Sequence, residues 1–183
     1  MPGFVYRGQI SGAQDPVTVD IVMAPSVTFT VGDAIYTDDG LAKLGTDSSD
    51  VFGIVVAIVD KNGIDLNNTS SSNYDGTWSE STNTYTSSAT NDDSDGKQVR
   101  VKVVPDPYAL WYNDADGDFT FPTDQFRMGN LLNEAQLDES TFTDEDIGQF
   151  QIWEIDPAGT DDDSECLCRI SRWQGSAMGP ETA

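Results

Sequence analysis

The stretch Val27–Ala57, VTFTVGDAIYTDDGLAKLGTDSSDVFGIVVA, carries the clearest structural pattern in the chain. Apolar and polar residues alternate over Val27–Val31, which predicts a β-strand with one buried face. The Asp-Asp-Gly sequence at Asp38–Gly40 is typical of a tight hairpin turn, because glycine tolerates the positive φ that such turns require. Together these features predict a meander of short antiparallel strands.

Two further segments on either side of a polar region extend this prediction. Val51–Val59 is a nine-residue apolar run rich in Val and Ile, which predicts a central strand that is buried on both faces. Gln98–Val104 alternates regularly, so we expect its valines at 99, 101 and 103 to point inward and Arg100 and Lys102 to point outward. The N-terminal half is therefore expected to form a set of short strands around a central buried strand.

The composition of the chain agrees with an all-β fold. The chain has 183 residues, of which 37% are hydrophobic, and this is enough to bury a core. Of the 32 acidic residues, 25 are Asp, a residue that favours turns and caps over helix interiors. The fold class that we predict is all-β with little helix.

The charge and the missing residue types exclude several function classes. With 9 Lys plus Arg against 32 Asp plus Glu, the net charge is -23, which repels nucleic-acid backbones. The chain has no His, so we expect no His-based catalytic triad and no enzyme activity. No apolar run is long enough to span a membrane, and we expect neither a membrane partner nor a signal peptide. Abundant Asp with scarce Lys also suits a protein that stays soluble in concentrated salt.

Composition shifts divide the chain into parts. Residues 1–16 are rich in Gly and Pro and are expected to form an extended arm, followed by a domain over residues 17–104. That domain contains a Ser/Thr/Asp-rich insertion at residues 64–96, which we expect to lie on the surface as a long loop with a short hairpin. The Pro105-Asp-Pro107 sequence is a stiff break, and residues 105–183 are expected to form the second β-rich domain.

One acidic stretch resembles the start of a calcium-binding loop. Asp114, Asp116 and Asp118 place carboxylates at alternate positions. The full pattern requires Gly at the sixth position and Glu at the twelfth, whereas this chain has Phe119 and Gln125 there. A solvated acidic turn is therefore the preferred interpretation, and these three aspartates are only weak candidates for a metal site.

The last predicted strand contains two of the few cations. Arg169 and Arg172 are expected to lie opposite a strand that carries Glu154, whose side chain we expect to point outward. One interpretation is a set of cross-strand ion pairs at the surface. The other is that scarce cations are used for contacts with a partner or a sister subunit. The sequence favours neither.

The order of features along the chain resembles a known family. A strand, a Gly-Asp turn, an Asp-Gly hairpin and a Gly-Ile-Val strand in Val27–Ala57 resemble the β-tulip module of head decoration (cement) proteins of tailed double-stranded DNA viruses. Val99–Pro107 and the segments that begin at Met128 and Leu137 are similar to the second half of such proteins. The insertion at residues 64–96 departs from the simple module. The resemblance implies a β-tulip or small β-barrel-like N-terminal domain followed by a second small β-rich domain, with no catalytic residue and no cofactor.

The resemblance also implies partners and a location. The chain would be made in the host cytoplasm and would bind the major capsid protein on the outer surface of the virion, as a homotrimer, without binding nucleic acid or membrane. The arm would supply contacts through apolar side chains and one charged anchor, and the last strand would supply contacts between subunits. The residues predicted for these interfaces are Phe4, Val5, Tyr6 and Arg7 in the arm and Arg169, Arg172 and Trp173 in the last strand.

Two functions of other classes remain open from the sequence. The first is a host-surface or carbohydrate-binding module that uses the insertion and its aromatic residues, among them Trp78. The second is a calcium-stabilised structural domain of a tail or a surface layer.

Overall fold

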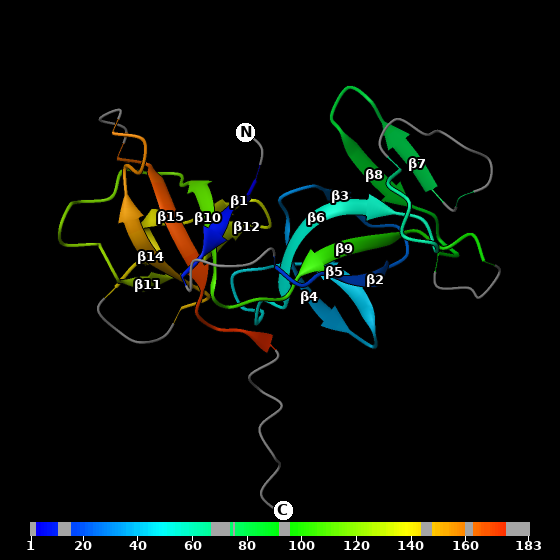
Figure 1. Ribbon diagram of the computed structural model, residues 1–183, viewed down its shortest axis with the longest axis horizontal. Coiled ribbons are helices and arrows are strands. Elements are labelled where there is room, and N and C mark those ends of the chain that lie inside the picture. Colours follow the sequence, from blue (N-terminus) through cyan, green and yellow to red (C-terminus); the bar gives the residue numbers. More distant parts are fainter. Residues whose placement is uncertain are drawn as a thin grey trace, which may run out of the picture.

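The computed structural model describes residues 3–10, 16–66, 74, 76–91, 96–143, 148–159 and 163–174. Within these residues the fold is all-β with a single 3-10 turn, which confirms the predicted fold class. Figure 1 shows two groups of strands side by side, with a hairpin projecting from one of them. The elements are β1 (Val5–Gln9), β2 (Val19–Met23), β3 (Thr28–Thr30), β4 (Ala34–Asp38), β5 (Leu41–Leu44), β6 (Gly53–Val59), β7 (Gly76–Ser79), β8 (Thr84–Ser87), β9 (Arg100–Val104), β10 (Ala109–Asp114), β11 (Met128–Gly129), β12 (Leu131–Asn133), β13 (Gln136–Leu137), η1 (Glu139–Thr141), β14 (Phe150–Ile155) and β15 (Glu165–Ile170).

The first group is a closed barrel with the strand order β2-β5-β4-β6-β9. Strands β4 and β5 form the predicted hairpin, and Asp39 and Gly40 at its tip have φ values of 51° and 79°, as a tight turn between twisted strands requires. Strand β6 pairs with both β4 and β9, which confirms the prediction of a central strand. Val101 and Val103 of β9 are fully buried inside the barrel, so the predicted alternation is confirmed as well.

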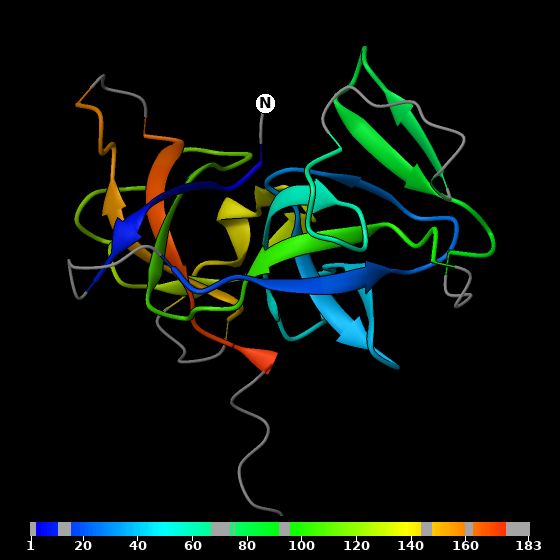
Figure 2. The ribbon, with the colours of Figure 1, turned by 45° about the vertical axis from the view of Figure 1, so that its right-hand side comes forward.

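The insertion contributes a hairpin that packs beside the barrel. Strands β7 and β8 pair antiparallel, as predicted, and β8 also pairs with β3 to form a three-stranded sheet. Figure 2 shows this hairpin projecting from the barrel. Its Tyr85 is buried, and Trp78 packs against the barrel core. Asn91 fastens the end of the hairpin, since its side-chain amide donates to the carbonyl of Met23 at 2.7 Å and accepts from the Val99 backbone N–H at 2.8 Å.

The second group is a five-stranded antiparallel sheet with the order β1-β10-β15-β14-β11. The prediction of an extended arm is wrong for residues 5–9, because these residues form β1 and pair with β10 of the same chain. Phe4, just before β1, is 3% exposed and its ring stacks on that of Phe150 at a centroid distance of 4.7 Å. Burial of this aromatic side chain stabilises the strand against the sheet.

The buried side chains form two clusters. One lies inside the barrel and includes Val101 and Val103. The other, which we call the shared core, contains Ala34 and Ile54 from the barrel together with Trp111 and Phe150 from the sheet. Backbone hydrogen bonds also join the two groups, such as the one from the Val51 N–H to the Arg172 carbonyl at 3.1 Å. Because the shared core holds residues of both groups, we expect the two groups to unfold together.

Candidate interaction surface

The five-stranded sheet has one face in the shared core and one face that points outward. On β15, Cys166 and Cys168 are buried as free thiols on the inner side, while the residues between and after them point outward. The outward face carries Arg7 of β1, Tyr112 of β10, and Leu167 and Arg169 of β15. We call these four residues the outward sheet face. Tyr112 lies directly opposite Leu167 in the strand register, so the face is continuous across β10 and β15.

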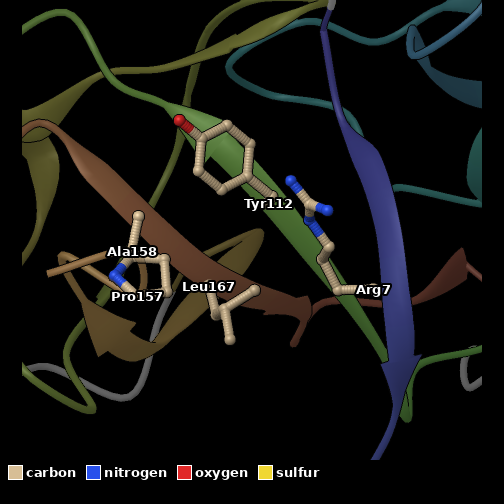
Figure 3. A pocket seen from close by; sticks show the side chains of 5 residues that line it. All are labelled: Arg7, Tyr112, Pro157, Ala158 and Leu167. Carbon is tan, nitrogen blue, oxygen red and sulfur yellow. The ribbon is translucent and has the colours of Figure 1, made fainter. Parts of the chain in front are cut away.

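One hollow on this face contains Arg7. It has a volume of about 360 Å³ and is lined by Arg7, Tyr112, Pro157, Ala158 and Leu167. Figure 3 shows the Arg7 side chain reaching from β1 toward the Tyr112 ring on β10. The guanidinium carbon lies 5.2 Å from the centre of that ring, within the range of a cation–π contact. We call this hollow the Arg7 pocket.

A second hollow lies at the other end of β15. It has a volume of about 340 Å³ and is lined by Pro107, Tyr108, Arg169, Ile170, Ser171 and Trp173. Tyr108 is 61% exposed, so its ring is accessible at the rim of this hollow. We call this hollow the Arg169 pocket. Each pocket therefore combines one arginine with one tyrosine and apolar walls.

The register of β14 and β15 shows what lies opposite Arg169. Arg169 lies opposite Gln151 and Glu154 lies opposite Leu167, with an irregularity between Ile152 and Glu154. The Arg169 Nε donates to the Gln151 side-chain oxygen at 2.8 Å. Glu154 is exposed, as predicted. Of the two interpretations of Arg169, an ion pair with Glu154 is absent among the described residues, and a contact with a partner stays a prediction.

The arginines of the outward sheet face differ in their partners from other cations. Lys43 forms an ion pair with Asp38, and Arg127 pairs with Asp124 at 2.7 Å. Among the residues that the structure describes, neither Arg7 nor Arg169 forms an ion pair. In a chain with 32 acidic residues, two arginines on one face are thus left without a carboxylate.

The other predicted interface residues lie partly in contacts within the chain. Phe4 is a core residue, and Val5 and Tyr6 are half-buried in β1. Arg172 forms an ion pair with Asp50. These contacts explain how the residues stabilise the fold, and their role between subunits stays a prediction.

Trp173 ties the end of the sheet to the barrel. Its indole Nε1 donates to the Phe52 carbonyl at 2.9 Å, and its backbone forms an isolated bridge with Val51. Gln174 extends this connection, since its side-chain oxygen accepts from the Thr37 backbone N–H at 2.7 Å. Trp173 also lines the Arg169 pocket, so it joins that pocket to the barrel.

The aspartates considered for calcium take part in local hydrogen bonds. Asp114 accepts from the Ser164 hydroxyl at 2.7 Å, and Asp116 accepts from the Glu139 backbone N–H at 2.8 Å. Burial raises the pKa of Glu139, and neighbouring aspartates, Asp118 among them, raise it further. In the described part of the chain, no group of three or more acidic, Cys or His residues is placed to hold a metal ion.

The sequence predicted the two arginines as interface residues but did not predict the hollows that surround them. Tyr108, Tyr112 and Leu167 come from segments that meet only through the pairing of β10 with β15. The one signal in the sequence was the scarcity of cations, because a strand that carries some of the few Arg residues is a candidate for a charged contact.

A scan against protein-family models, a search of curated proteins and a search of solved structures each found no match. The described residues contain no helix that is long and apolar enough to cross a membrane. The function proposed below is therefore inferred from the residues and their geometry.

Proposed function

We propose that this chain is a capsid decoration (cement) protein, which binds the outer surface of the major capsid protein shell of a tailed virus and stabilises that shell mechanically. The observation that carries the proposal is the outward sheet face, where Arg7 lies over the half-buried Tyr112 and Arg169 lines a hollow with the exposed Tyr108. Neither arginine forms an ion pair among the described residues. Arginine and tyrosine are enriched where proteins bind other proteins. The sequence resemblance described above supports the same function.

The rest of the surface suits such a role. A net charge of -23 keeps separate copies and separate particles apart in solution. The same charge opposes binding to packaged DNA. Attraction to a protein shell must therefore come from a local surface, and the outward sheet face offers two arginines that form no ion pair within the described residues, beside the exposed Glu154.

The shared core lets force pass from the outward sheet face into the barrel. Gln149 is fully buried, and its side chain donates to the Thr46 carbonyl at 2.6 Å and accepts from the Leu131 backbone N–H at 2.9 Å. It thereby joins the loop before β6 to both the β12–β13 hairpin and the start of β14. A rigid connection of this kind suits a clamp, because a load on the sheet is resisted by the whole chain.

Several copies of this chain bound to one shell would stabilise it together. Many weak contacts, repeated at symmetric positions and linked in a homotrimer, hold more strongly than any single contact. The proposed partners are the major capsid protein and further copies of this chain. No catalytic step and no cofactor are part of this proposal.

Quantitative mass spectrometry of purified virus particles tests the proposal. We expect the chain to copurify with the shell at a fixed ratio to the major capsid protein, and to be removed by surface proteolysis of intact particles. A chain that is absent from particles and stays free in the infected cell would contradict the proposed function.

A further inference from the structure

We infer that this chain binds further copies of itself through an aromatic loop: the Phe121 ring of one copy enters an apolar hollow between β1 and the barrel of the next copy. The self-association belongs to the isolated chain and is tested there. The place of this contact on a virus shell rests on the proposed function.

The segment between β10 and β11 exposes two aromatic rings. Phe121 is 67% exposed, the highest fraction of any aromatic side chain among the described residues, and Phe126 is 54% exposed. Residues 120–123 carry no charge. Figure 1 shows this segment on the side of the sheet away from the barrel. An exposed apolar group of this kind marks a contact surface. We call residues 120–127 the Phe121 loop.

A buried carboxylate holds the Phe121 loop in one conformation. Asp124 is 7% exposed, and its side chain accepts from the Thr120 backbone N–H at 2.6 Å and from the Arg127 Nη1 at 2.7 Å. The Asp124 backbone N–H also donates to the Thr120 carbonyl at 2.9 Å. A loop that is fixed before it binds loses little entropy on binding.

Phe126 is anchored to its own sheet. Its φ of 70° lies in the left-handed region, which a bulky residue adopts only where its surroundings fix it, often at a binding site. Its N–H donates to the Ile152 carbonyl at 3.0 Å, and its ring meets that of Trp153 edge-to-face at 5.9 Å. No such ring contact involves Phe121 within the described residues, which leaves Phe121 as the ring that can enter a partner.

A hollow of matching chemistry lies where β1 meets the barrel. Its volume is about 310 Å³. Its lining includes the buried Phe4, Val55 and Trp111 and the partly exposed Tyr6, Val31 and Val56. An apolar cavity of about 150 Å³ holds a benzene molecule, so this hollow has room for a phenyl ring. We call it the Val56 hollow.

Strand irregularities place side chains of this hollow. The register between β6 and β9 shifts between Val55 and Ala57, so Val56 is the extra residue of a bulge. Val55 belongs to the cluster inside the barrel, whereas Val56 packs against the shared core. The register of β1 shifts as well, just after Tyr6. Bulges re-aim side chains in this way beside binding sites.

The charge of the chain favours an uncharged contact between copies. Two copies with a net charge of -23 repel each other, so they approach best through surfaces without charge. Residues 120–123 and the lining of the Val56 hollow are such surfaces, and the Asp124 of the loop is buried and paired with Arg127. The exposed charges that flank them in the sequence, Asp118 and Arg7, have opposite signs.

The contact joins two different parts of the molecule. The Phe121 loop leads into β11 at one edge of the sheet, and the Val56 hollow borders β1 at the other edge. Each copy can therefore offer its loop to one neighbour and its hollow to another, and a ring of three is the homotrimer of the proposed function. One ring in one hollow buries far less than a standard interface of about 1,600 Å², so we expect a Kd on the order of 100 μM.

Sedimentation equilibrium of the isolated chain, from about 10 μM to about 1 mM, tests the inference. We expect reversible association that is at least threefold tighter in 1 M than in 0.15 M NaCl, because the screening length falls from about 8 Å to about 3 Å. A chain that stays monomeric at both salt concentrations would overturn the inference.

Variants with matched controls locate the contact. Phe121→Ser should weaken association at least tenfold, whereas Ile64→Ser, which removes another side chain that is 62% exposed, should leave it within twofold. Val56→Asp should also weaken it at least tenfold, whereas Val17→Asp adds the same charge at an exposed position and should have a small effect. Amide spectra verify folding, and Val31→Asp replaces Val56→Asp if that variant is not folded. Equal association of wild type and Phe121→Ser, or equal losses in a variant and its control, would contradict the proposed contact.

A mixing experiment tests whether the loop binds the hollow. Phe121→Ser retains the hollow and Val56→Asp retains the loop, so the mixture should form a one-to-one pair although neither variant associates alone. A mixture that stays monomeric would show that the loop does not bind the hollow.

Further results distinguish this inference from the proposed function. Particles that carry the chain, combined with an isolated chain that stays monomeric, would overturn the inference alone. Self-association through Phe121 by a chain that is absent from particles would overturn the proposed function alone. If the isolated chain stays monomeric and Phe121→Ser lowers its copy number on particles, the occupant is the shell protein, and the assignment to a second copy is wrong.

Discussion

The barrel and the outward sheet face use their cations in different ways. At the tip of the β4–β5 hairpin, Lys43 pairs with Asp38 of the adjacent strand, and the hydrogen bond between them raises the pKa of Lys43. On the sheet, Arg7 lies over an aromatic ring and Arg169 binds a neutral amide. Both regions belong to the same acidic chain. The comparison teaches that strand register, rather than overall charge, decides which cations lie opposite a carboxylate and which lie opposite a neutral side chain.

The largest expected effect concerns the core that joins the two regions. Phe150 is fully buried and stacks on Phe4, so Phe150→Ala should lower the free energy of unfolding by about 3–5 kcal/mol. Val103→Ala inside the barrel is the matched change in the other region. Urea unfolding followed by fluorescence and circular dichroism should give one transition for each variant. Separate transitions for the barrel and the sheet would contradict the expectation that the two groups unfold together.

The second effect has the opposite sign. Burial raises the pKa of Asp33 to about 7, and the nearby Glu134 carboxylate adds to this rise, whereas a hydrogen bond from the Thr30 backbone N–H lowers it. The folded chain therefore binds this proton more tightly than the unfolded chain, and Asp33 costs stability as the pH rises from about 4 to above 7. Asp33→Asn removes this cost, since the amide oxygen can still accept from Thr30.

The expected result for Asp33→Asn is a gain in stability that is small near pH 4 and reaches roughly 2–4 kcal/mol at pH 8. Unfolding by urea across this pH range measures it. Asp47→Asn, an exposed residue, makes the same change in charge and should show no comparable gain. If both variants gain equally, general charge repulsion explains the effect and the burial of Asp33 does not.

A smaller effect is expected for an arginine that already has a carboxylate. Arg172 pairs with Asp50 and also donates to the Ser48 carbonyl at 2.8 Å, but both partners of the ion pair are well exposed. Arg172→Gln should therefore cost about 1 kcal/mol or less. Chemical unfolding measures this cost. A loss above about 3 kcal/mol would place this pair among the main supports of the fold.

The smallest effect on stability is expected on the outward sheet face. Arg7 is exposed and makes one aromatic contact, so Arg7→Gln should change the free energy of unfolding by less than about 1 kcal/mol. A variant that is strongly destabilised would make Arg7 a structural residue and remove the contrast with Lys43.

Local patterns in the sequence predicted much of the barrel. The Asp39-Gly40 turn, the apolar run in β6 and the alternating valines of β9 each depend on residues that are neighbours in the chain. Propensity and periodicity report such features directly, because turn conformation and strand faces are local properties. The hairpin of the insertion was predicted for the same reason.

Features that depend on distant pairing could not be predicted. Strand β1 pairs with β10, about a hundred residues later, and nothing local separates such a strand from an extended arm. The position of Arg169 opposite Gln151 depends on the register between β14 and β15, which no local pattern specifies. Both pockets also require the pairing of β10 with β15, so the sequence could nominate the arginines but not their surroundings.

The place of β1 in the sheet also decides how the face should be tested. Deleting residues 1–10 would remove the buried Phe4 and an entire strand, and the loss of any function would then follow from a damaged fold. Substitution of exposed side chains on an intact sheet avoids this problem.

The most direct measurement is the number of copies of the chain on each particle, determined by quantitative mass spectrometry after the purified chain is added to particles that lack it. Wild type and the control Lys43→Gln/Lys61→Gln should bind to the same level, because both control residues lie in the barrel and its loops. Arg7→Gln/Arg169→Gln, with the same change in charge, should bind at least tenfold less. Equal occupancy by all three proteins would contradict the claim that the outward sheet face holds the chain on the shell.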